Sequence, residues 1–226
     1  MSDKYRYDFE YDVQYVYTDC QVLKNKLGIK NSDVLIAAER EITSMWIARL
    51  KTEPLKGKLD FSHLKSIHRC IFSDIYDWAG EPRVVDIAKG NEFCRSIYID
   101  DYADSIFSRL KNEKFLLLTE KIEIPQRLAY YMSEINVLHP FREGNGRTQR
   151  LFIEYLGAVC GFHIDFSDVS ENEMIMASAN AYAKDYDMIN KMFERICVPV
   201  SLTEQEKSIR FFFGEKSTEY NIFKEL

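Results

Sequence analysis

The stretch HPFREGNGRTQR, residues 139–150, brings glycines, charged side chains and a helix start together in one short segment. Gly144 and Gly146 flank Asn145 and permit backbone geometry in which several N–H groups converge on one anion. A helical run, RTQRLFIEYLGAVC, follows at once, so the positive end of a helix dipole would face the same point. The stretch therefore predicts a binding site for a polyphosphate.

Charged and aromatic side chains around the glycines would give this site its chemistry. Arg147 and Arg150 stand three residues apart on the first turn of the expected helix, where both guanidinium groups are predicted to clamp phosphate oxygens. Glu143 is predicted to bind Mg²⁺ beside those phosphates. His139 is the natural base for an attacking hydroxyl near pH 7, and Phe141 is expected to anchor the loop in the core. Together they predict in-line attack on a phosphate of a metal-bound nucleotide.

Each feature also has a simpler interpretation when it stands alone. A Gly-Asn-Gly triplet is a common turn, and two arginines on a helix usually form a solvated face. His63, His68 and His163 have no partner at metal-ligand spacing, so we expect them to be packing or surface residues. The combination within twelve consecutive residues is what favours a nucleotide site.

Hydrophobic periodicity predicts helices over most of the remaining chain. A helix is expected to begin at Ser32 as N-cap, with one apolar face made of Leu35, Ala38, Ile42, Met45 and Trp46. A second should begin at Asp60 and end before the break at 79–82. Further helices are expected at 101–113, 125–138, 145–160, 169–195 and 203–213. Within 83–98, β-branched residues surround Lys89-Gly90-Asn91, which predicts a two-stranded hairpin flap. The fold class is all-α with a short β-hairpin.

Composition sets further bounds on what the chain can be. Its 226 residues are 46% hydrophobic, which suits one main core, and the net charge of -6 argues against a general nucleic-acid surface. The sequence lacks a stretch of about 20 apolar residues and a signal-peptide core, so we expect no membrane partner and a cytoplasmic location by default, with specialised export as an effector left open. The cysteines are expected to be reduced packing residues; they are Cys20, Cys70, Cys94, Cys160 and Cys197.

The sequence resembles Fic-domain proteins, whose signature HxFx(D/E)GNGRxxR is filled at every fixed position between His139 and Arg150. Residues 22–29 (VLKNKLGI), residues 67–83 and the KGN triplet at 89–91 are also similar to the family, so the resemblance covers roughly 20–195. It implies the mainly helical Fic fold with its hairpin flap. The expected parts are a Tyr-rich N-terminal arm at 1–20, a Fic domain at 21–197 and a C-terminal helix or tail at 198–226.

The resemblance implies AMPylation, in which AMP moves from Mg-ATP to a Tyr, Thr or Ser hydroxyl of a target protein and pyrophosphate leaves. His139 would be the general base and Glu143 the metal ligand. The implied ATP-binding residues are Asn136, Gly144, Asn145, Gly146, Arg147, Arg150, Lys89 and Gly90. The flap residues Lys89, Gly90 and Asn91 would hold the backbone of the target as an added strand.

Many family members are inhibited by a helix carrying (S/T)xxxE(G/N), whose glutamate pairs with the second arginine of the loop. Ser167 to Asn172 matches this string, but the segment is predicted to begin a core helix with Ser167 or Ser170 as cap. The tail at 208–221 resembles the inhibitory segment of short relatives. We therefore expect Glu215 to reach Arg150, or else a separate inhibitory antitoxin or no inhibitor.

Other readings of the same residues remain alternatives. In the first alternative, the chain keeps the Fic fold but transfers phosphate, UMP or phosphocholine instead of AMP. Relatives that transfer phosphate usually depart from the GNGR sequence, which is intact here. The chain would otherwise be a non-catalytic nucleotide-binding interaction protein, which needs no base at His139. Its length without an added delivery domain leans toward a toxin-like intracellular enzyme.

Overall fold

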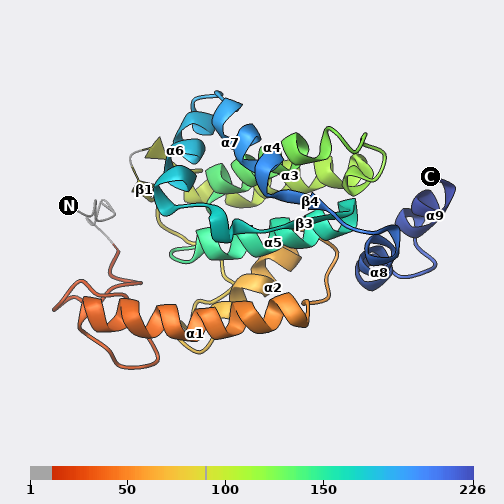
Figure 1. Ribbon diagram of the computed structural model, residues 1–226. Helices are drawn as coiled ribbons and strands as arrows, with labels where there is room; N and C mark the ends of the chain where they lie inside the picture. Colours follow the sequence, from red (N-terminus) through yellow and green to blue (C-terminus); the bar gives the residue numbers. More distant parts are fainter. Residues whose placement is uncertain (1–11, 90) are drawn as a thin grey trace.

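The computed structural model describes residues 12–89 and 91–226, and helices dominate them (Figure 1). The helices are α1 (Ser32–Thr52), α2 (Phe61–Phe72), α3 (Ile99–Asn112), α4 (Ile124–Leu138), α5 (Asn145–Cys160), α6 (Glu171–Tyr182), α7 (Asp187–Ile196), α8 (Leu202–Phe213) and α9 (Thr218–Glu225). The hairpin pairs β1 (Ala88–Lys89) with β2 (Asn91–Glu92), and a second antiparallel pair joins β3 (Phe162–Ile164) to β4 (Cys197–Pro199). The expected helical fold with a short hairpin is confirmed. None of the helices in the described ranges is long and apolar enough to cross a membrane.

The helix that follows the glycine-rich loop, α5, runs through the middle of the molecule (Figure 1). It contacts α2, α4, α8 and β3, so most of its surface is enclosed by other elements. Its buried apolar and aromatic side chains are Leu151, Phe152, Ile153, Tyr155, Leu156, Val159 and Cys160. The loop at the start of α5 is therefore held by a rigid central element.

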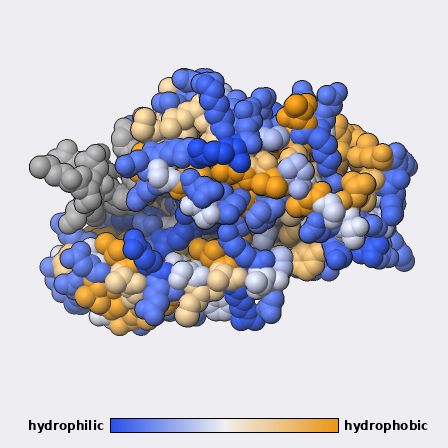
Figure 2. Space-filling view, viewed as in Figure 1, coloured by the Kyte–Doolittle hydropathy of each residue, from blue (hydrophilic) through white to orange (hydrophobic). Residues whose placement is uncertain are grey.

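Helix α1 lies at the edge of the fold and departs from its prediction. Its N-cap is Asn31, whose side chain accepts a hydrogen bond from the Val34 N–H, and Ser32 is already the first helical residue. Met45 is 62% exposed, whereas Thr43 and Leu50 are buried. The expected apolar face holds at Leu35, which is buried, and at Ile42, which packs against the core, but it is wrong at Met45; the inward side also carries the buried Thr43. Figure 2 shows hydrophobic residues scattered among polar ones on the visible face, including over α1.

Other element boundaries follow capping residues. Asp60 caps α2 through the His63 N–H, and Ser170 caps α6 through the Glu173 N–H, as expected. The predicted helix at 169–195 is broken into α6 and α7 at a turn where Lys184 has a φ of 68°. The weakly patterned end of the chain forms α9, capped by Ser217.

The described part of the N-terminal segment packs against the body of the protein. Asp12 is buried and forms an ion pair with Arg142 of the glycine-rich loop, at 2.5 Å from Oδ2 to Nη2. The Tyr15 ring meets Trp78 edge-on, and its hydroxyl accepts a hydrogen bond from the Val84 N–H. Residues 1–11 of the predicted arm lie outside the described residues.

Candidate functional site

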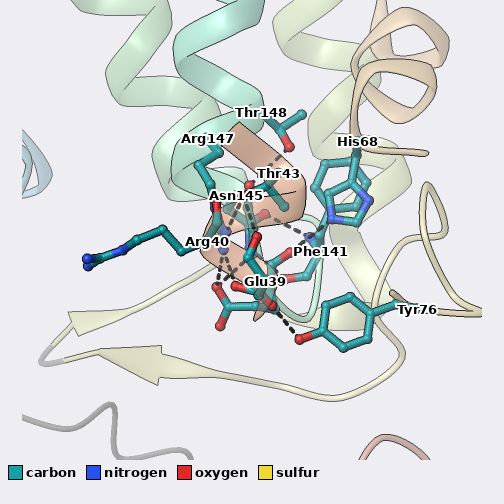
Figure 3. A network of polar contacts seen from close by, with 11 residues as sticks. Glu39, Arg40, Thr43, His68, Tyr76, Phe141, Asn145, Arg147 and Thr148 are labelled. Carbon is teal, nitrogen blue, oxygen red and sulfur yellow. Dashed lines mark hydrogen bonds and ion pairs between the residues drawn. The ribbon is translucent and has the colours of Figure 1, made fainter. Parts of the chain in front are cut away.

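The loop between α4 and α5 is fixed by its own side chains (Figure 3). Asn145 Oδ1 accepts a hydrogen bond from the Phe141 N–H at 2.8 Å, and its Nδ2 donates to the Phe141 carbonyl at 2.7 Å. Phe141 is buried and stacks on His68 with ring centroids 3.8 Å apart, so its predicted anchoring role is confirmed. Gly144 has a φ of +82°, and a Cβ there would lie 2.2 Å from the Phe72 ring. Only glycine fits at position 144, and both polar atoms of the Asn145 side chain bond to the Phe141 backbone.

His68 is a packing histidine, as expected, and it supports the loop from beneath. Its Nδ1 accepts a hydrogen bond from the Gly80 N–H at 2.8 Å, so its Nε2 carries the hydrogen and donates to the Glu143 carbonyl at 2.9 Å. Burial lowers the pKa of His68 to about 3, and the charges of Arg147 and Arg69 add to that effect. The ring is therefore neutral at physiological pH.

His139 ends α4 in a left-handed conformation, with a φ of 43° and a ψ of 58°. Its Nδ1 lies 3.2 Å from the Asn136 carbonyl, which can only accept a hydrogen bond. In this tautomer Nδ1 carries the hydrogen, and Nε2 holds the lone pair that can take a proton. The imidazole stacks on Phe93 with centroids 3.6 Å apart. A non-glycine residue in this conformation, with its ring held on one face, has the features of a functional residue.

Arg83 connects the base of the hairpin to the loop. Its buried guanidinium donates to the carbonyls of His139 at 2.9 Å, Val85 at 2.7 Å and Cys94. Burial lowers the pKa of Arg83 to about 10, which leaves the group charged at neutral pH. The Cys94 N–H donates to the Val137 carbonyl at 2.9 Å, so the hairpin base is held against the end of α4. The sequence analysis singled out neither Arg83 nor Phe93. An aromatic residue two positions after Asn91 of the hairpin was the available signal for Phe93.

Arg147 turns toward α1. Its Nη2 lies 2.6 Å from Glu39 Oε1, and its Nη1 donates to Thr43 Oγ1 at 3.1 Å. The guanidinium also lies over the Phe72 ring, 4.7 Å from its centroid. Burial lowers the pKa of Arg147, but Glu39 and Glu143 outweigh burial and raise it above its usual value. Arg147 thus pairs with a glutamate that the sequence analysis did not single out, and the binding of one anion by Arg147 and Arg150 together stays a prediction.

Glu143 lies beside this ion pair. Its Oε1 accepts a hydrogen bond from the Gly144 N–H at 2.8 Å and lies 3.4 Å from Arg147 Nη2. Burial and the charge of Glu39 raise the pKa of Glu143, while Arg147 partly lowers it. The other oxygen of Glu39 accepts a hydrogen bond from the Tyr76 hydroxyl. Figure 3 shows these contacts linking α1, the segment after α2 and the start of α5.

The first turn of α5 is the part of the site suited to an anion. The Thr148 N–H donates to the Gly144 carbonyl, so the N–H groups of residues 145–147 precede the backbone ladder of the helix. A Cβ added to Gly146 would lie 3.4 Å from Arg150 Nη1, which places that guanidinium back over the helix start. Asn136 Oδ1 accepts a hydrogen bond from Gln149 Nε2 at 3.3 Å, so its side chain faces α5.

The predicted flap residues and the predicted regulatory residue Glu215 lie outside the loop that carries His139 and Glu143. Lys89 and Asn91 pair across the hairpin, but Gly90 at its tip lies outside the described residues. Glu215 forms an ion pair with Arg210, 3.2 Å from Oε1 to Nε. The helix that precedes Glu215, α8, packs on the later turns of α5, where Gln205 donates to the Val159 carbonyl. The expected contact of Glu215 with Arg150 is therefore wrong, because the tail docks at the other end of α5.

Known proteins are similar to this chain in sequence and in fold. The model of the Fic/DOC family matches residues 58–156. The chain is 41% identical over 182 residues to "Protein adenylyltransferase VbhT" of Bartonella schoenbuchensis, a match that spans 79% of this chain and 38% of VbhT. It is 34% identical over 197 residues to "Probable protein adenylyltransferase Fic" of Escherichia coli K12, covering 87% of this chain and 96% of that protein. The structure of BepC from Bartonella tribocorum with bound AMPPNP has a TM-score of 0.76 at 25% identity, over 83% of this chain and 98% of BepC. This chain belongs to the Fic/DOC family.

Proposed function

We propose that this chain is a protein adenylyltransferase that moves AMP from ATP to a hydroxyl of a target protein. The observation that carries the proposal is the placement of His139, with Nδ1 bonded to the Asn136 carbonyl, in the loop that leads to the N–H groups preceding the backbone ladder of α5. A base and an anion site on adjoining turns suit attack of a hydroxyl on a nucleotide phosphate. The name of VbhT and the AMPPNP bound to BepC support AMP transfer as the reaction.

His139 would take the proton of the target hydroxyl through Nε2 as that oxygen bonds to the α-phosphorus. The bond from this phosphorus to the bridging oxygen of the β-phosphate breaks, and pyrophosphate leaves. The stack on Phe93 and the bond to Asn136 hold the imidazole in one orientation, which reduces the reorganisation needed for proton transfer. The start of α5 and the Arg150 guanidinium would bind the phosphates that become the leaving group.

The Glu143 carboxylate is the protein ligand that would hold Mg²⁺. Among the described residues, no group of three or more His, Cys, Asp or Glu side chains could hold a metal. One carboxylate beside a phosphate site is nevertheless an ordinary magnesium arrangement, because Mg²⁺ takes most of its other ligands from phosphates and water. When bound there, Mg²⁺ would neutralise charge on the phosphates, and Glu143 would supply its protein ligand.

The target would lie along the hairpin. Arg83 holds the hairpin base against the His139 carbonyl, so a strand added to β1 or β2 would bring its side chains close to the imidazole. Such main-chain pairing accepts Tyr, Thr or Ser targets of varied sequence. With Glu215 paired to Arg210, inhibition would come from a separate partner rather than from the tail.

Labelled ATP distinguishes this reaction from its alternatives. Compared with the same cell lysate without the protein, incubation with α-³²P-ATP and, in parallel, γ-³²P-ATP should add labelled protein from the α position alone. Label from the γ position would indicate phosphate transfer and contradict AMP transfer. Label from neither position, with AMPPNP still binding, would indicate a non-catalytic nucleotide-binding protein.

A further inference from the structure

Two carboxylates from distant parts of the chain contact the same guanidinium nitrogen. Glu39 of α1 and Glu143 of the loop both approach Nη2 of Arg147, at 2.6 Å and 3.4 Å respectively. Glu39 lies 108 residues before Arg147 in the sequence. The shorter contact is the stronger one, so the Arg147 guanidinium binds Glu39 of α1 more strongly than Glu143 of the loop.

Further contacts fix Arg147 on the α1 side. Thr43, one turn after Glu39, accepts a hydrogen bond from Arg147 Nη1 at 3.1 Å and is buried. Tyr76 donates to the second oxygen of Glu39 and so holds that carboxylate in place. The Phe72 ring supports the guanidinium from another side. These contacts resist movement of Arg147 toward Glu143.

We propose that Glu39 is a positioning residue for the metal site: by holding Arg147 on α1, it keeps that cation from pairing more closely with the Glu143 carboxylate than the 3.4 Å contact already present. The proposal rests on the proposed function, in which Glu143 binds Mg²⁺. An arginine that pairs fully with a metal-binding carboxylate competes with the metal for its oxygens. Without Glu39, Arg147 has Glu143 as its nearer acidic partner among the described residues, and metal affinity falls.

Nucleotide binding with and without metal tests this directly. Affinity for AMPPNP is measured by calorimetry in Mn²⁺ and in EDTA for the wild type, Glu39→Gln, Thr43→Val and Glu41→Gln. Glu39→Gln should weaken binding in Mn²⁺ by about tenfold or more and leave binding in EDTA within about twofold. Thr43→Val, which changes no charge, should weaken AMPPNP binding in Mn²⁺ by about threefold. Glu41 is exposed on the same helix, so Glu41→Gln should change neither value.

Specific outcomes would overturn the proposal. Equal losses in Mn²⁺ and EDTA would indicate a general structural role for Glu39. A loss in Glu39→Gln with an unchanged Thr43→Val would mean that the charge of Glu39 acts on the metal directly. If thermal unfolding shows that Glu39→Gln does not fold, Thr43→Val alone decides. If the wild type binds AMPPNP no more tightly in Mn²⁺ than in EDTA, the inference is overturned. Failure to transfer AMP would contradict the proposed function but would leave this binding test valid.

Discussion

At the scale of single residues, the loop depends on groups whose protonation states are set by their neighbours. His68 is the clearest case, because it accepts a hydrogen bond from Gly80 and donates one to the Glu143 carbonyl. A proton on Nδ1 would break the first of these bonds inside the core. Burial, followed by the positive charges of Arg147 and Arg69, lowers the pKa of His68 to about 3.

The protein should therefore lose stability as the pH falls. Below pH 6.5 the unfolded chain binds a proton at His68 that the folded protein excludes until about pH 3, so stability falls across this window. At about 1.4 kcal/mol per pH unit, the loss by pH 4.5 is about 3 kcal/mol. Urea unfolding between pH 7 and 4.5 should show a shallower decline for His68→Gln, which keeps a donor for the Glu143 carbonyl but does not titrate. Parallel curves for the two proteins would contradict this account.

At the scale of elements, α8 is a packing helix on the later turns of α5. Phe212 is buried and lies against Tyr155 and His63, with ring centroids 5.4 Å and 5.9 Å away. Ser201 and Glu204 form a capping box at its start. These contacts hold the helix in the core, while Glu215 beyond its end remains 63% exposed beside Arg210.

Removing Glu215 should leave AMP transfer unchanged. Glu215→Gln breaks an exposed ion pair, which contributes at most about 1 kcal/mol, and touches no residue of the loop. The initial rate of label transfer from α-³²P-ATP should stay within about twofold of the wild type, as should that of Glu225→Gln in the same tail. A several-fold activation specific to Glu215→Gln would restore the inhibitory role that the structure does not support.

The sequence predicted the elements better than their contacts. The hairpin was found because β-branched residues flank a turn triplet, and α2 because Asp60 precedes an apolar periodicity. The break between α6 and α7 carries neither Gly nor Pro, so Lys184 in a left-handed conformation had no signal. Glu39 in mid-helix resembles a solvated residue. Its burial depends on Arg147, far along the chain, which local patterns do not report.

At the scale of the whole molecule, three distant segments converge on the loop that begins at His139. Asp12 pairs with Arg142, Glu39 with Arg147, and Arg83 donates to the His139 carbonyl. The N-terminal segment, α1 and the hairpin base therefore each hold a different part of the loop. The glycine-rich motif alone predicts an anion site, and these contacts fix the positions of His139, the loop and the start of α5 relative to one another.

The most direct test of this account is the activity of His139→Ala measured together with its nucleotide affinity. Loss of the base should reduce AMP transfer from α-³²P-ATP by about 10²-fold to 10⁴-fold, while AMPPNP affinity by calorimetry stays within about threefold. His163→Ala, at an exposed position on β3, serves as the matched control and should leave both quantities unchanged. Transfer that persists in His139→Ala at the wild-type rate would contradict the central claim.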